Sequence, residues 1–184
     1  MYIDVRFKFG QLQCRTEQTS AKSWYVRGDS RMSVRLTDDE AWDVLERSHT
    51  GILTTLRADG WPVTLPVWFV VADRAIGMMA PSRTRKVSRI RRDSRASFLV
   101  ESGERWAELR AVHLSGTVEE ILDEATRDSI DALLDQKYAA FRPASSALPS
   151  ATQDHYANRT FLRFVPGPRI LSWDNRRITP PGEG

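Results

Sequence analysis

The sequence has one cysteine, Cys14, and three histidines, His49, His113 and His155. A single thiol forms neither an intramolecular disulfide nor a multi-thiolate metal site. The histidines are too far apart for a two-histidine zinc motif. The 10 glycines and 9 prolines are scattered along the chain, which excludes collagen-like and low-complexity classes. The sequence therefore predicts no metal site.

Long apolar runs are also missing. No stretch approaches the roughly 18 apolar residues of a membrane-spanning helix, and the N-terminus lacks the apolar region of a secretory signal. The chain has 184 residues, 41% of them hydrophobic and 28% charged, which is typical of one globular domain. We therefore expect a cytoplasmic protein without a membrane partner.

The familiar catalytic motifs are absent as well. The sequence contains no G-x-S-x-G elbow, no Walker A loop and no G-x-G-x-x-G run. It therefore lacks the motifs typical of α/β-hydrolases and of P-loop nucleotidases. His113 lies in the run Ala111-Val112-His113-Leu114-Ser115, where a strand histidine is usually structural. No catalytic acid, base or nucleophile can be assigned.

What the sequence does contain is a local excess of positive charge. The net charge is only +3, but residues 83–95 carry seven cations and one anion, Asp93. A cationic cluster in an otherwise near-neutral chain favours an anionic ligand over a long polyanion. A solvated basic helix face is the alternative.

The hydrophobic pattern of the sequence changes at Met32. Residues 1–31 show no helical period, whereas Thr37 and Glu40 form a capping-box pattern at the start of a helix. We therefore divide the chain into a poorly ordered extension, 1–31, with Met32 as the natural first residue, and one domain, 32–184. An extra strand within 1–31 is the alternative.

Hydrophobic periodicity predicts a mainly β protein. The first helix buries Ala41, Val44, Leu45 and Ser48, and prolines within 61–71 require an edge strand or a bulge. Tight turns and the lack of βαβ alternation indicate an antiparallel sheet of six to seven strands, closed as a small split barrel with helices outside. The expected strands are 52–57, 61–71, 75–80, 96–101, 106–119, 160–165 and 170–173, with a hairpin turn at Asp59-Gly60. The other expected helices are 84–92, with Val87 and Ile90 inward, and 122–141, and a loop rich in Pro, Ser and Ala is expected over 143–150.

The segment from Ala80 to Asp93 is the clearest candidate site. A strand ends at Pro81, Ser82 and Thr84 occupy the turn, and Arg85 and Lys86 enter the first turn of a helix. The free N–H groups and positive end of a helix favour an anion. Hydroxyl donors, an arginine and a lysine at that end predict a phosphate cradle. A helix start with its cations turned to water is the alternative.

Three runs carry a resemblance to a known family. GILTTLRADGWPVTLPVWFVV, APSRTRKVSRIRRDSRASFLV and WAELRAVHLSGTVEE together resemble the pyridoxamine 5′-phosphate oxidase-like FMN-binding split barrel. The closest branch is the one with coenzyme F420-dependent (deazaflavin) oxidoreductases. The resemblance covers Leu36 to Ile178 and is specific for the fold, much less so for the cofactor.

The resemblance implies a homodimer with two cofactor sites at the subunit interface. The isoalloxazine or deazaflavin ring lies against the strand carrying Pro66, Val67 and Trp68, and the cofactor phosphate lies near the residues matching Ser82, Thr84, Arg85 and Lys86. The Trp106 region of the partner chain closes the site. The C-terminal signature of the vitamin B6 oxidase is not recognisable in 167–177, so that reaction is not expected.

These observations lead to one functional hypothesis and two rivals. The hypothesis is an oxidoreductase that moves a hydride between a flavin-type cofactor, preferably coenzyme F420 and otherwise FMN, and a small organic molecule. Trp68, Phe69 and Met78 shape its apolar pocket, and Trp173 to Asn175 either reach that pocket or form an exposed turn. One rival is a non-catalytic flavin or haem carrier or sensor. The other, a nucleic-acid binder, is disfavoured because no aromatics interleave with the cations of 83–95.

Overall fold

The computed structural model describes residues 33–143 and 149–178. The predicted extension 1–31 and Met32 lie outside the described residues, as does most of the loop predicted over 143–150. Within the described ranges, no helix has the length and apolar character needed to cross a bilayer.

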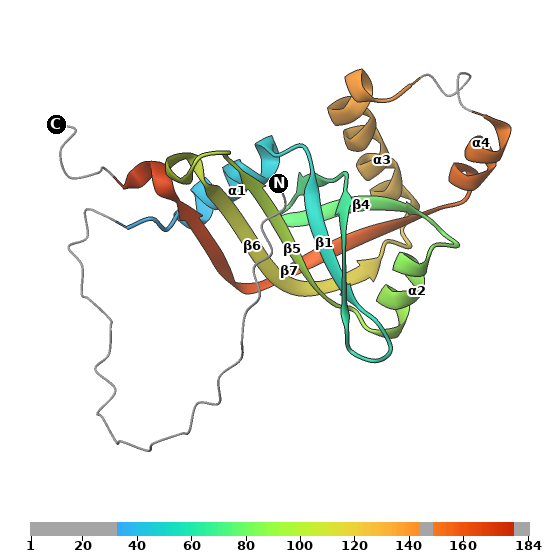
Figure 1. Ribbon diagram of the computed structural model, residues 1–184. Coiled ribbons are helices and arrows are strands. Elements are labelled where there is room, and N and C mark those ends of the chain that lie inside the picture. The colour runs from blue at the N-terminus through green and yellow to red at the C-terminus, as the bar shows by residue number, and fades with distance from the viewer. Residues whose placement is uncertain (1–32, 144–148, 179–184) are drawn as a thin grey trace, which may run out of the picture.

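Seven antiparallel strands form one curled sheet in the order β2-β1-β5-β6-β7-β4-β3 (Figure 1). This confirms the mainly β fold class and the number of strands expected from the sequence. The strands are β1 (Gly51–Leu56), β2 (Pro62–Val67), β3 (Val70–Ala72), β4 (Ala75–Pro81), β5 (Arg95–Ser102), β6 (Arg110–Glu120) and β7 (Arg159–Asp174).

Four α-helices flank the sheet in the described part of the chain: α1 (Asp38–Arg47), α2 (Arg85–Arg92), α3 (Glu124–Tyr138) and α4 (Ser150–Ala157). The capping box at the start of α1 is confirmed, since Thr37 accepts from the Glu40 N–H while the Glu40 carboxylate accepts from the Thr37 N–H. Short 3₁₀ turns cover Trp106–Glu108, Ala139–Phe141 and Asn175–Arg177.

Two apolar clusters hold the helices against the sheet. The larger joins Ala41 and Leu45 of α1 and Val87 and Ile90 of α2 to one face of the sheet. The smaller joins α3 to the other face, over β3, β4 and the start of β7. A Cβ on Gly77 would lie 2.6 Å from Ile130, so glycine in β4 allows α3 to approach the sheet closely.

The single strand predicted over 61–71 is wrong. The structure divides it into β2 and β3, with Trp68 and Phe69 in neither strand. Pro62 and Pro66 lack the N–H that a central strand needs, and β2 accordingly lies at a sheet edge, paired with β1 alone. Of the edge strand and the bulge that the prolines allowed, the structure has the edge strand.

The two final strands predicted from the sequence are one strand, β7. The run Pro166-Gly167-Pro168 lies between the two predicted strands, and the pairing of β6 with β7 passes it by a shift of register between Leu114 and Gly116. Prolines are tolerated at such a bulge because the ladder is already interrupted.

Three other boundaries also differ from expectation. Trp106 lies in a 3₁₀ turn, and β6 begins only at Arg110. The helix predicted over 122–141 ends as α3 at Tyr138, so Phe141 is exposed. Ser150, predicted as loop, begins the unforeseen helix α4.

Candidate cofactor site

A cavity of about 1020 Å³ lies where β2, the end of β4, α3, α4 and the first turn of α2 come together. This is at the upper end of the range of small-molecule sites, roughly 300–1,000 Å³. Its walls combine apolar side chains with charged side chains that come from several elements. The lining residues are Pro66, Val67, Trp68, Met79, Pro81, Lys86, Leu134, Asp135, Arg142, Pro143, Thr152, Gln153, Asp154, Ala157 and Arg159.

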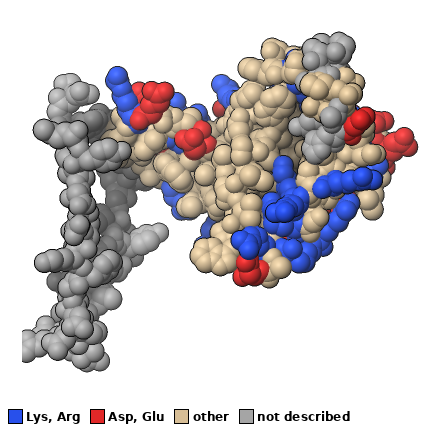
Figure 2. Space-filling model, turned by 45° about the vertical axis from the view of Figure 1, so that its right-hand side comes forward, with Lys and Arg blue, Asp and Glu red and all other residues tan. Residues whose placement is uncertain are grey.

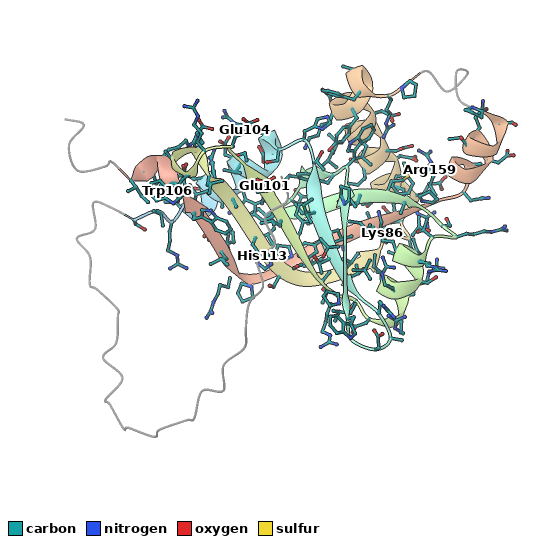
Figure 3. The ribbon with its side chains drawn as sticks, in the orientation of Figure 1. Lys86, Glu101, Glu104, Trp106, His113 and Arg159 are labelled. Atoms are coloured by element: carbon teal, nitrogen blue, oxygen red, sulfur yellow. The ribbon has the colours of Figure 1, made fainter. Side chains whose placement is uncertain are left out.

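Four of the eight residues predicted to bind the cofactor line this cavity. Pro66, Val67 and Trp68 contribute one wall, and Lys86 reaches it from the first turn of α2. Figure 3 shows Lys86 and Arg159 at the same end of the sheet. The structure thus brings together two segments that are about 20 residues apart in the sequence.

Ser82 and Thr84 lie beside the cavity and support its rim. The Ser82 N–H donates to the carbonyl of Asn158 at 2.9 Å, and its hydroxyl accepts from Thr160 at 2.9 Å. Thr84 is the N-cap of α2, and its hydroxyl is 3.5 Å from the Val87 N–H that it accepts from. Both residues therefore fix the strand-to-helix turn that presents Lys86.

The cations of 83–95 fall into two groups. Arg91 is paired with Glu120 and Arg95 with Asp93, whereas Arg89 donates to Thr55 at 2.9 Å and Arg92 to the carbonyl of Leu56 at 2.6 Å. Arg89, Arg91 and Arg92 attach α2 to β1 and β6, whereas the Arg95–Asp93 pair lies within the turn between α2 and β5. Figure 2 shows how Lys and Arg side chains gather on one side of the folded body.

The remaining three cations, Arg83, Arg85 and Lys86, have no ion pair or hydrogen bond with the described residues. Arg83 and Arg85 are exposed, while Lys86 is partly buried. Burial, together with the positive charge of Arg89, lowers the pKa of Lys86 below its usual value. A partly buried ammonium that lacks an anion within its own chain is a suitable partner for an anionic ligand.

The apolar wall of the cavity has an aromatic backing. Trp68 lines the cavity and stacks on Tyr138 of α3, with ring centroids 4.4 Å apart and an angle of 5° between the planes. The guanidinium of Arg142 lies 5.6 Å from the Trp68 ring centroid. The prediction that Phe69 and Met78 shape the pocket is wrong, because both are buried in the main core. Met79, on the opposite face of β4, lines the cavity instead.

Two ion pairs neutralise charge along the α3 side. Arg142 pairs with Asp135, and Arg159 pairs with Asp131 at 2.8 Å. Arg159 also lies over the ring of Phe161, 5.5 Å from its centroid. Sequence reasoning missed these residues, because α3, α4 and the start of β7 follow the basic segment by about 40 to 70 residues and carry no motif of their own.

Trp106 lies at the other end of the molecule (Figure 3). Its carbonyl accepts from the side-chain amide of Asn175 at 2.7 Å, and its side chain is 61% exposed. Asp174 is paired with Arg176 and Arg110. None of these residues lines the cavity of the same chain. Trp173 and Asp174 end β7, and Asn175 begins a 3₁₀ turn; whether they reach a substrate pocket stays a prediction.

Comparison with known proteins supports the resemblance. The sequence profile of the family described as "Pyridoxamine 5'-phosphate oxidase" matches residues 37–166. The chain belongs to this family. No curated protein matches it.

Solved structures of the same fold are numerous. A conserved hypothetical protein, Rv2991 from Mycobacterium tuberculosis, is 26% identical, with a TM-score of 0.67 over 82% of this chain and 92% of that one. An F420 reductase is 21% identical, with a TM-score of 0.54 over 70% and 94% of the two chains. The haem storage protein HutZ from Vibrio cholerae is 11% identical, with a TM-score of 0.59 over 77% and 96%. The last two likenesses concern the fold alone.

Proposed function

We propose that this pyridoxamine 5′-phosphate oxidase family member is an oxidoreductase that transfers a hydride between a bound flavin-type cofactor and a small organic substrate. Coenzyme F420 is the preferred cofactor and FMN the second. The observation that carries the proposal is the position of Lys86. It is a partly buried cation without an anion among the described residues, and it faces a cavity walled by Pro66, Val67 and Trp68.

The residues present fit a phosphorylated cofactor with a planar ring. Lys86 would hold the phosphate, with the exposed Arg85 beside it, while the wall from Pro66 to Trp68 would bear the ring. When bound, the cofactor supplies the hydride chemistry. The chain itself binds the anion, orients the ring and excludes water with Trp68, Met79 and Leu134. The cavity is large enough to leave room for a small second molecule.

We further propose that the protein is a homodimer and that the partner completes the site. A cross-strand row on the sheet face opposite the main core pairs Ile52 with Leu99, Leu99 with His113, and His113 with Leu171. Leu171 is 51% exposed. These three aliphatic side chains and His113, which we call the cross-strand row, favour burial of this sheet face against a second subunit. Trp106, exposed and far from the cavity of its own chain, is then available to the partner's site.

A binding and turnover experiment tests the proposal. The purified protein is incubated with FMN, coenzyme F420 or haem, separated from free ligand, and its absorption spectrum recorded. Consumption of the reduced cofactor is then followed with candidate acceptors. We expect retention of F420 or FMN and acceptor-dependent oxidation of the reduced form. A protein that retains none of the three, or retains only haem, contradicts the proposal.

The second candidate is a non-catalytic carrier with the same fold. It is favoured by the structural likeness to HutZ, a haem storage protein, and by the lack of any assignable acid or base. The structure describes the side chains of two histidines, His49 and His113, and neither lines the cavity. Tight retention of a cofactor without turnover of any acceptor is the result that favours the carrier.

A further inference from the structure

The two edges of the sheet are consecutive in the sequence. β2 ends at Val67 at one edge, and β3 begins at Val70 at the other. Three peptide units span at most about 11 Å, so the sheet curls until its edges meet at the two residues between them. We call Trp68 and Phe69 the seam.

The seam residues are not paired with a neighbouring strand, and the side chain of Tyr138 provides hydrogen bonds in place of such pairing. The Phe69 N–H donates to the Tyr138 hydroxyl oxygen at 2.8 Å. That oxygen is also 2.9 Å from the Phe69 carbonyl and 2.8 Å from the His49 carbonyl, and its one proton is donated to one of these two oxygens. Phe69 and Tyr138 are both fully buried. Because a buried backbone N–H needs a partner, the hydroxyl fixes the orientation of the Phe69 peptide.

The ring of Tyr138 fixes the other half of the seam. It stacks on the indole of Trp68, which forms part of the cavity wall. Tyr138 itself does not line the cavity. It touches the backbone of one seam residue and the side chain of the other, and reaches a bound molecule only through them.

We infer that Tyr138 is a positioning residue: its hydroxyl and ring together hold the seam in the one arrangement that bears the cofactor ring. The inference rests on the proposed function, since it requires a ligand against the wall from Pro66 to Trp68. It adds a positioning role to α3, which also contributes Leu134 and Asp135 to the cavity wall. Small displacements of a bound group have large effects on reactivity, so a released seam weakens both affinity and hydride transfer.

The test compares Tyr138→Phe with a matched control, Ser172→Ala. Tyr138→Phe keeps the ring and removes the hydroxyl. Ser172 makes the same kind of contact elsewhere: its buried hydroxyl accepts from the Leu36 N–H at 3.1 Å and is 3.5 Å from the Leu36 carbonyl. Ser172 does not line the cavity. Both substitutions therefore remove one buried hydroxyl that bridges the N–H and the carbonyl of a distant residue, and the Tyr138 hydroxyl also lies 2.8 Å from the His49 carbonyl.

Three quantities are measured below the unfolding transition of both variants: the dissociation constants for FMN and F420, the visible spectrum of the bound cofactor, and amide exchange at Phe69. We expect Tyr138→Phe to weaken cofactor binding about tenfold or more, to shift the bound spectrum and to speed Phe69 exchange. Ser172→Ala should lose a comparable amount of thermal stability. Its dissociation constants, the spectrum of its bound cofactor and its Phe69 amide exchange should all equal those of the wild type.

The outcomes separate this inference from the proposed function. If the wild type binds a cofactor, Lys86→Ala weakens it, and Tyr138→Phe behaves like Ser172→Ala, the positioning role is wrong and the proposed function stands. If the wild type binds neither cofactor, the proposed function fails and the inference fails with it. Should Tyr138→Phe not fold, exchange in the wild type decides. If the Phe69 amide exchanges as slowly as the amides of the β4–β7 ladder, the positioning role of Tyr138 is supported. If it exchanges as fast as an exposed loop amide, the positioning role is wrong.

Discussion

Replacement of Lys86 by alanine is the sharpest perturbation of the proposed site. In the described chain the ammonium has no anionic partner, and burial and Arg89 lower its pKa. A phosphate at this position would therefore gain a charge-assisted contact, typically worth about 1.5–3 kcal/mol. We expect Lys86→Ala to weaken cofactor binding about 10- to 100-fold, since each 1.4 kcal/mol is a factor of ten.

Arg91→Ala is the matched control. It removes the same charge from the same helix, but Arg91 is already held by Glu120 through two contacts of 2.5 and 3.1 Å. Titration with FMN and coenzyme F420, followed by fluorescence, should give wild-type affinity for this variant. Without cofactor, Lys86→Ala should unfold at the wild-type temperature or slightly above it, because a partly buried unpaired cation is removed. Equal affinity of wild type and Lys86→Ala for both cofactors would refute the phosphate cradle.

The remaining predictions concern the partner, the pH dependence and a helix cap. Leu171→Glu places a charge in the cross-strand row and should give a monomer in sedimentation. Leu122→Glu, at a still more exposed leucine outside the row, should leave the dimer intact, and a dimeric Leu171→Glu variant contradicts the proposed interface. Burial lowers the pKa of Lys137 to about 8, so the cost of keeping it charged is present below pH 8 and is lost as the pH rises toward its ordinary value of 10.5. Relative to Lys137→Met, the free energy of unfolding of the wild type should therefore rise over that interval, and a flat difference contradicts the assignment. Thr37→Ala removes the cap of α1 and should cost about 1 kcal/mol in chemical denaturation, with cofactor affinity unchanged.

Local sequence signals predicted most of the elements. The capping box placed the start of α1, and Asp59-Gly60 placed the β1–β2 turn, where Gly60 has a φ of 83°. The spacing of Val87 and Ile90, three residues apart on one helix face, predicted the buried face of α2. Each of these signals is contained within a few residues, so no knowledge of the rest of the fold is needed.

The seam and the continuity of β7 were not predictable in this way. The apolar run from Trp61 to Val71 contains no turn residue at Trp68, because the break there results from closure of the sheet on itself. In β7, the prolines at 166 and 168 indicate a local break, but the pairing on either side continues the strand. Both features depend on contacts between residues far apart in the chain.

The candidate site divides along the same line. Resemblance to the family identified the wall at Pro66 to Trp68, and the hydroxyl and basic residues at the start of α2 identified Lys86; the cavity brings the two together. The α3 and α4 walls, with Arg142 and Arg159, carry no motif. The predicted role of Trp106, closure of the cofactor site of a second subunit, stays a prediction.

A crystal structure of the protein soaked with coenzyme F420 and, separately, with FMN would show directly where the cofactor binds. We expect a phosphate oxygen within hydrogen-bonding distance of the Lys86 ammonium, roughly 2.7–3.2 Å, and the ring of the cofactor against the backbone from Pro66 to Trp68. A cofactor bound with its phosphate away from Lys86, or at any other surface of the molecule, would contradict this expectation.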